Sequence, residues 1–142
     1  MHVGVLEKQG RSVSIWLGGV SVGFEPYPFG KATMELTDIP FGTTDWSKIE
    51  PIAHPGETGT ALWRTCQFGN TRVRMVHYSP GYVADHWCRK GHILLCLEGQ
   101  LETELDDGRT FTLSAGMSYQ VADNAEAHRS STATGAKLFV VD

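Results

Sequence analysis

The clearest pattern in the chain is an alternation of apolar and polar residues with a period of two. Residues 101–105 read Leu-Glu-Thr-Glu-Leu, and residues 110–113 read Thr-Phe-Thr-Leu after an Asp-Asp-Gly turn. Successive side chains of a β-strand point to opposite faces, so the alternation predicts two half-buried strands joined by a tight turn. Glu102 and Glu104 share one face, and we expect a solvated strand face there rather than a pair of catalytic carboxylates.

An earlier part of the chain predicts a β-hairpin. Residues 61–68 and 71–78 are rich in β-branched and aromatic residues and flank a Gly-Asn dipeptide, which is typical of a two-residue turn. Tight pairing about this turn places Cys66 opposite Val73, and we expect Cys66 to fill the core rather than to bind a metal. His77 shares a strand face with Val73, which makes it a candidate for the core or for a cavity wall.

Short apolar runs between turns predict further strands in the second half of the chain, at residues 93–97, 117–121 and 137–141. A turn at residues 98–100 is expected to separate the first of these runs from the strand at residues 101–105. Strands recur roughly every 8–12 residues, and no segment shows a helical period. The chain is therefore predicted to be all-β, a sandwich or barrel of antiparallel strands.

The first 60 residues carry little periodicity. Residues 35–48 and 51–60 contain proline and glycine and are expected to be loops, with an exposed His54 in the second loop. A Pro-rich segment at residues 25–30 looks like a linker. We predict that the natural domain begins near Met34, so that residues 1–33 are an N-terminal extension and residues 34–142 form a single domain. In the alternative, part of the extension adds an edge strand to the sheet.

Composition and charge narrow the possible functions. At 142 residues, with 41% apolar and 20% charged residues, the chain has the balance of one folded domain. Its net charge of −4 gives no basic footprint for nucleic acid, and no apolar run has the length of a membrane helix. Three cysteines without a C-x-x-C pair favour free thiols in a reducing compartment, so we expect a cytoplasmic protein without nucleic-acid or membrane partners.

Residues 85–92, Asp-His-Trp-Cys-Arg-Lys-Gly-His, hold the densest group of metal-binding side chains. On a strand, His86 and Cys88 would share one face and Trp87 would point away. His92 begins the next apolar run, and if the two segments pair, two imidazoles and a thiol face one cavity. Divalent transition metals prefer such ligands. The alternative is a pair of hydrogen-bonded histidines and a small buried cysteine.

The same stretch resembles the first motif of small cupins, G-x5-H-x-H-x3,4-E-x6-G. The segment from His86 to Gly99 has this spacing, with Cys88 at the second histidine and His92 at the glutamate. The opening glycine, Gly81, lies one residue closer than usual.

The second cupin motif resembles residues 108–116 together with His128. It departs by having Ser114 and Ala122 in place of the usual prolines and one extra residue before His128. The resemblance spans residues 73–141. Within the cupins the chain is similar to the small bacterial group named after a D-H-C-W motif, although residues 85–88 read D-H-W-C.

The resemblance implies a small antiparallel β-barrel, or jelly roll, with one divalent metal ion inside. The four motif positions fall on His86, Cys88, His92 and His128, which are therefore the predicted metal ligands. A thiolate with three imidazoles favours zinc, nickel or copper, with iron also possible. In the alternative, the barrel has lost its metal and these are ordinary interior groups. Tyr119 and Arg129 would lie near the mouth of the pocket.

Three functions follow from the resemblance. The first is a metal-dependent enzyme, a lyase, isomerase or dioxygenase, acting on a small molecule inside the barrel. The second is a module that binds or senses a small ligand, with or without a metal. The third is a metal-free barrel that works through a partner surface. An open coordination position would favour the enzyme, and a closed four-ligand site would favour sensing or structure. The resemblance also implies a homodimer.

Overall fold

The computed structural model describes residues 13–17, 20–24 and 36–142. The chain divides into two units, Met1–Leu36 and Thr37–Asp142. In the first unit, β1 (Val13–Leu17) and β2 (Val20–Phe24) pair with each other in antiparallel orientation. The linker predicted at residues 25–30 and the domain start predicted near Met34 lie outside the described residues.

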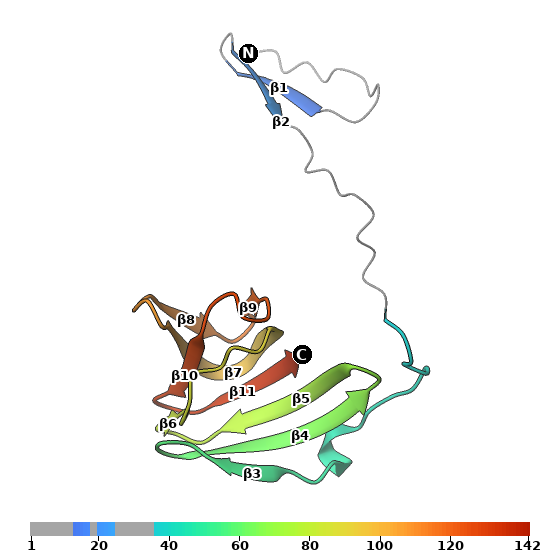
Figure 1. Ribbon diagram of the computed structural model, residues 1–142, viewed down its shortest axis with the longest axis vertical. Helices are drawn as coiled ribbons and strands as arrows, with labels where there is room; N and C mark the ends of the chain where they lie inside the picture. Colours follow the sequence, from blue (N-terminus) through green and yellow to red (C-terminus); the bar gives the residue numbers. More distant parts are fainter. Residues whose placement is uncertain (1–12, 18–19, 25–35) are drawn as a thin grey trace. The chain divides into compact units, whose positions relative to one another are not determined.

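The second unit consists of antiparallel strands and one short 3-10 helix in the part of the chain that the structure describes (Figure 1). Its elements are η1 (Trp46–Lys48), β3 (Ile52–Pro55), β4 (Thr60–Phe68), β5 (Thr71–Tyr78), β6 (Tyr82–Val83), β7 (His92–Leu105), β8 (Thr110–Ser114), β9 (Ser118–Val121), β10 (His128–Thr132) and β11 (Ala136–Val141). The prediction of an all-β antiparallel fold is confirmed. Within the described residues, no helix has the length and apolar character needed to cross a membrane.

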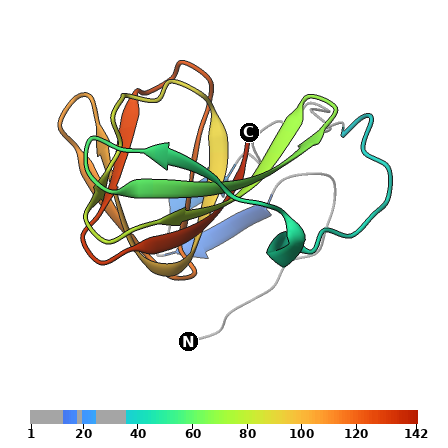
Figure 2. The ribbon, with the colours of Figure 1, turned by 90° about the horizontal axis from the view of Figure 1, so that it is seen from below.

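Two sheets make up this unit, and they share β7. The first sheet has the order β3-β4-β5-β11-β7-β9, and the second has the order β8-β7-β10-β6. β7 pairs with β9 and β11 along its first half and with β8 and β10 along its second half. The view from below shows the strands curling into an open barrel (Figure 2).

The predicted turn at residues 98–100 is wrong, because β7 runs through it as one strand of 14 residues. The strand bends at Gly99, which has a φ of +76°. A Cβ atom at this position would lie 2.1 Å from the carbonyl oxygen of Gly135. Glycine adopts a positive φ without strain and lets the two backbones approach. The strand can therefore leave one sheet and enter the other, with a register shift against β11 between Lys137 and Leu138.

The bend also changes which side chains face the core. Before it, Leu94 and Cys96 are buried, and after it Leu101 and Leu105 are buried, so the inward positions shift from even to odd numbers. The core cluster consists of Val76, Leu94, Cys96, Leu101, Leu113, Ala136, Leu138 and Val140. On the outward face after the bend, Glu102 is exposed, which confirms the predicted solvated face for this residue, whereas Glu104 is half-buried and accepts a hydrogen bond from Arg129 at 3.0 Å.

In the second unit, three of the described strands were missed by the sequence reasoning. Residues 51–60 were expected to be a loop, but β3 pairs with β4 at the edge of the first sheet. An edge strand needs hydrogen bonds on one side only and therefore tolerates Pro55 at its end. His54 is not an exposed loop residue, since its ring centroid lies 4.1 Å from that of Trp63. The strands β6 and β10 are short and lack apolar alternation, which explains why no pattern indicated them.

The hairpin prediction is confirmed in its register, with Cys66 opposite Val73. The side of the hairpin that faces the core was not predicted correctly. Arg74 and Val76 are buried on β5, whereas His77 is exposed, so the core or cavity role considered for His77 is wrong. His77 was grouped with Val73 as an inward residue, but the buried positions of β5 are the even ones, so the predicted phase of the strand is inverted.

We expect Gly99→Ala to lower the free energy of unfolding by about 3 kcal/mol or more, because it combines backbone strain with a clash. Gly116→Ala is the matched control. Gly116 has a φ of +90° but nothing within 4 Å of an added Cβ, so only the strain of about 1–2 kcal/mol remains. Urea unfolding of both variants measures the difference. Equal losses would contradict the close approach at Gly99.

Candidate metal centre

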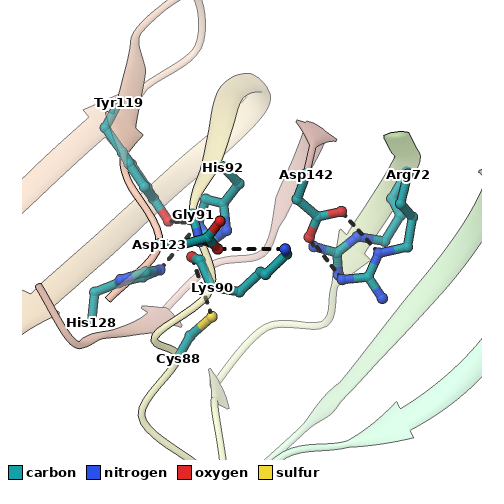
Figure 3. Close-up of polar contacts among 10 residues, drawn as sticks. Arg72, Cys88, Lys90, Gly91, His92, Tyr119, Asp123, His128 and Asp142 are labelled. Carbon is teal, nitrogen blue, oxygen red and sulfur yellow. Dashed lines mark hydrogen bonds and ion pairs between the residues drawn. The ribbon is translucent and has the colours of Figure 1, made fainter. Parts of the chain in front are cut away.

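Three of the four predicted metal ligands come together at one end of the barrel (Figure 3). Cys88 lies in the loop before β7, His92 is the first residue of β7, and His128 is the first residue of β10. One ligand atom from each residue lies within 4.8 Å of the others. The structure therefore joins two segments that are distant in sequence into one group of sulfur and nitrogen donors.

Backbone hydrogen bonds fix the relative position of Cys88 and His128. The amide of Cys88 donates to the carbonyl of His128 at 2.8 Å, and the amide of His128 donates to the carbonyl of Cys88 at 3.0 Å. This reciprocal pair forms an isolated antiparallel β-bridge. Residues that exchange both hydrogen bonds lie directly opposite each other, so their side chains leave the bridge on the same side.

The position of His92 depends on the glycine before it. The amide of Gly91 donates to Oδ1 of Asp123 at 2.7 Å, and a Cβ atom at Gly91 would lie 2.5 Å from the amide nitrogen of Asp123. This contact holds the start of β7 against the loop that precedes β10. The His92 side chain shares the inward face of β7 with Leu94, which places the imidazole inside the barrel.

The hydrogen bonds of the two imidazoles point their Nε2 atoms at each other. Nδ1 of His128 lies 3.0 Å from the carbonyl oxygen of Glu126, and since a carbonyl only accepts, this Nδ1 carries the hydrogen. Neutral His128 therefore presents a lone pair at Nε2, which is 3.1 Å from Nε2 of His92. The hydroxyl of Tyr119 lies 2.8 Å from the same His92 nitrogen. A histidine held at Nδ1 by a carbonyl is the usual arrangement around a bound metal.

The protonation states of the group suit a metal ion. Burial, with a smaller effect of the nearby His128, lowers the pKa of His92 to about 4, so this imidazole is neutral. The neighbouring His128 lowers the pKa of the Cys88 thiol, and the neighbouring thiol raises the pKa of the His128 imidazole. Thiolate and neutral imidazole are the forms that bind metals, so a metal ion would displace a proton from this pair.

The dimensions of the group agree with those of a metal site. A tetrahedral ion with bonds to nitrogen of about 2.0–2.1 Å and to sulfur of about 2.3 Å would hold its ligand atoms about 3.3–3.6 Å apart. The two Nε2 atoms are 3.1 Å apart, and the three donors all lie within 4.8 Å of one another. In addition, Nδ1 of His92 is buried and has no hydrogen-bond partner among the described residues. The donor set therefore fits a divalent transition metal after small shifts.

His86, the fourth predicted ligand, lies outside this group of described residues. Its side chain is 69% exposed, and its Nδ1 lies 2.6 Å from Oδ1 of Asp85. The segment that was expected to be a strand is a loop between β6 and β7, so the alternation that would align His86 with Cys88 does not apply. Trp87 is partly exposed, and the guanidinium carbon of Arg129 lies 5.0 Å from the centre of its ring.

A cavity of about 230 Å³ opens beside the three donors. Tyr119 and Arg129 line it, as the sequence predicted, and so does His86. Other parts of its wall were missed by the sequence reasoning, namely Trp63, Arg72, Arg74, Tyr78, Tyr82 and Asp142. The sequence did contain an indication of this part of the cavity wall. The even positions of β5 place Arg72 and Arg74 on the same strand face as buried Val76. His128 and Tyr119 also line a second cavity of about 260 Å³.

Comparison with known proteins identifies the fold. No protein-family model and no curated protein matches the chain. Many solved structures do match, and the following three are among them. A predicted oxalate decarboxylase from Thermotoga maritima is 16% identical, with a TM-score of 0.61 over 70% of this chain and 96% of that chain. Ectoine synthase from P. lautus is 17% identical, with a TM-score of 0.58 over 71% of this chain and 76% of that chain.

The third match is an RmlC-like cupin from Shewanella frigidimarina, 18% identical, with a TM-score of 0.57 over 73% of this chain and 91% of that chain. At these identities the likeness shows the fold. The chain has the cupin fold, and the cupin resemblance of the two sequence motifs is confirmed at that level. Placement in the D-H-C-W group stays a prediction.

We expect the metal-free protein to lose stability as the pH falls from 6.5 towards 4. The unfolded chain binds a proton on His92 near its ordinary pKa of 6.5, but the folded protein does so only near 4, so unfolding takes up a proton in this window. His92→Gln should reduce this uptake by up to one proton. Urea unfolding at several pH values, with a chelator present, measures it. The same pH dependence in wild type and variant would contradict the depressed pKa.

Proposed function

We propose, from the cupin fold of this domain, that Cys88, His92 and His128 hold one divalent transition metal ion, and that the protein is a metal-dependent enzyme acting on a small molecule in the adjoining cavity. The observation that carries the proposal is the convergence of these three donors within 4.8 Å beside a cavity of about 230 Å³. Zinc, nickel, copper and iron all accept such a donor set, with the thiolate favouring the softer ions.

The number of protein ligands supports catalysis over a purely structural site. Catalytic zinc sites usually have three protein ligands and one open position, whereas structural sites are closed by four. His86, the remaining predicted ligand, is exposed and paired with Asp85. A ligand molecule in the cavity can therefore occupy the fourth position. A bound metal would supply Lewis-acid activation of a carbonyl group or a water molecule there.

The residues of the chain supply orientation and a proton donor. The carbonyl of Glu126 holds the His128 ring with Nε2 turned to the site. Burial raises the pKa of Tyr119, so its hydroxyl keeps its proton at neutral pH. This hydroxyl lies 2.8 Å from Nε2 of His92 and lines the cavity, where it can donate a hydrogen bond to the oxygen of a ligand.

The cupin fold alone does not determine which reaction is catalysed. The matched structures include an ectoine synthase and a predicted oxalate decarboxylase, so one fold carries different chemistries. Lyase, isomerase and dioxygenase activities all stay within the proposal. The alternative function is a module that binds or senses a small ligand without catalysis. It would be favoured if His86 turned away from Asp85 and closed the metal site as a fourth ligand.

Elemental analysis of the purified, untagged protein tests the metal proposal. We expect about one zinc, nickel, copper or iron ion per chain in the wild type and loss of the ion in His128→Ala, which removes one of three donors. His77→Ala is the matched control, because this histidine is exposed on the outer face of β5. Absence of metal in the wild type, even after reconstitution, would contradict the proposal.

The same measurement on His86→Ala separates enzyme from binding module. We expect this variant to keep its metal ion, because His86 lies outside the three-donor group of the described residues. Loss of the ion in His86→Ala would instead indicate a closed four-ligand site and favour the alternative function.

We further propose that the protein is a homodimer in the cytoplasm. The three cysteines are free, which suits a reducing compartment. Among the described strands, β3 pairs only with β4, and Ile52 on it is 63% exposed. An exposed edge of this kind is a template for strand pairing. Sedimentation equilibrium should give a dimer for the wild type and a monomer for Ile52→Lys, and a monomeric wild type would contradict the proposal.

A further inference from the structure

We infer that the cavity beside the metal ligands binds a small organic acid, whose carboxylate is held by Arg74 next to the indole of Trp63. The inference rests on the proposed function and deepens it, since it names the class of ligand for the same cavity. Three observations support it: a buried arginine that shares its one acidic partner, buried hydrogen-bond donors without acceptors, and the positive charge of the cavity wall.

Arg74 is an arginine in the interior of the barrel. The residue is 8% exposed and lines the cavity on the inward face of β5. Its guanidinium carbon lies 4.3 Å from the centre of the Trp63 ring, a distance typical of a cation–π contact. Stacking on the indole holds the planar guanidinium in one orientation. Burial of a charged group is unfavourable unless that group is paired and hydrogen-bonded.

Those partners leave one positive charge uncompensated. Arg72 donates to both carboxylate oxygens of Asp142, from Nε at 2.8 Å and from Nη2 at 2.7 Å (Figure 3). Arg74 donates to Oδ2 of Asp142 from Nη2 at 2.7 Å. Two guanidinium groups thus share one carboxylate. Burial alone would raise the pKa of Asp142, but the hydrogen bond from Arg72 and the charge of Arg74 lower it, so Asp142 is ionised. The three side chains together carry a net charge of about +1.

Hydrogen-bond donors beside the cavity are also left without acceptors. Nε of Arg74 and Nε1 of Trp63 are both buried and have no partner among the described residues. Both groups can only donate, and a buried donor without an acceptor is destabilising by roughly 1–3 kcal/mol. Small movements of the two side chains would present these donors to a ligand. A ligand rich in acceptor oxygens therefore complements this wall.

The remaining charges of the wall have the same sign. Arg72, Arg74, Lys90 and Arg129 line the cavity, and among the described residues Asp142 is the one acidic side chain that does so. Lys90 and Arg129 pair with acids outside the lining, as in the 3.4 Å contact of Lys90 with Asp123 that Figure 3 draws. A cavity lined by an excess of positive charge concentrates anions.

The shape and the apolar part of the wall favour a carboxylate over a bare inorganic anion. A guanidinium binds a carboxylate or a phosphate through two parallel hydrogen bonds, so the apolar part of the wall decides between them. Tyr78 and Tyr82 stack at 4.1 Å and line the cavity together with Trp63, and inorganic phosphate would leave this aromatic surface uncovered. The volume of about 230 Å³ is below the range of about 300–1,000 Å³ that drug-sized ligands need. The cavity is therefore suited to a small acid.

Isothermal titration calorimetry with benzoate and succinate tests the inference on chelator-treated and on zinc-loaded protein. We expect at least one of the two acids to bind both forms, with benzamide and succinamide binding at least tenfold more weakly. Arg74→Met should weaken acid binding roughly tenfold to a hundredfold, because a charge-assisted pair is lost. Arg74→Lys should give a smaller loss. Lys48→Met removes one positive charge at an exposed site, 81% exposed, and should change nothing.

Arg74→Met leaves Asp142 with one partner fewer, so its unfolding is measured first. If it does not fold, Arg74→Lys and the neutral amides decide the question. Three outcomes would overturn the inference: equal binding of acids and amides, absence of acid binding, and tighter binding of inorganic phosphate than of either acid.

The metal proposal can fail independently of this inference. Acid binding that requires zinc and is unchanged in both Arg74 variants would place the acid on the metal, which overturns the inference and leaves the metal proposal standing. Acid binding that depends on Arg74 in a protein that takes up no metal would support the inference and contradict the metal proposal.

Discussion

The rest of the structure depends on one strand that belongs to two sheets. β7 starts with His92, packs Leu94 and Cys96 into the core, bends at Gly99, and continues with a different set of inward residues. Because its first half pairs with β11 and its second half pairs with β10, the strand determines how the two sheets meet. This places His92 and His128, at the starts of β7 and β10, close enough for their Nε2 atoms to lie 3.1 Å apart.

Much of the fold was predictable because the sequence shows local alternation wherever one strand face is buried. The hairpin around the Gly-Asn turn and the strands at residues 101–105 and 110–113 follow from that pattern and from turn chemistry. What escaped prediction has little local signal. β10 contains mostly polar residues, and the bend at Gly99 resembles a turn unless its tertiary contact with Gly135 is known. Long-range pairing decided both cases.

The candidate site was predictable in its chemistry but only partly in its geometry. Spacing and residue type indicated Cys88, His92 and His128, which the fold brings together. His86 was aligned with Cys88 by strand alternation, but the segment that contains both residues is a loop. The burial of Arg74 was not predicted, because it depends on tertiary contacts, namely stacking on Trp63 and a hydrogen bond to Asp142.

Charge balance links the proposed metal site with the arginine wall. With a divalent ion bound, the two arginine side chains and the metal carry about four positive charges, against one negative charge each from the Cys88 thiolate and the side chain of Asp142. Both groups line one cavity. An excess of about two positive side-chain and metal charges on its wall is unfavourable in the absence of an anion. A small acid with one end at Arg74 and another oxygen near the metal would offset this excess at both ends of the cavity.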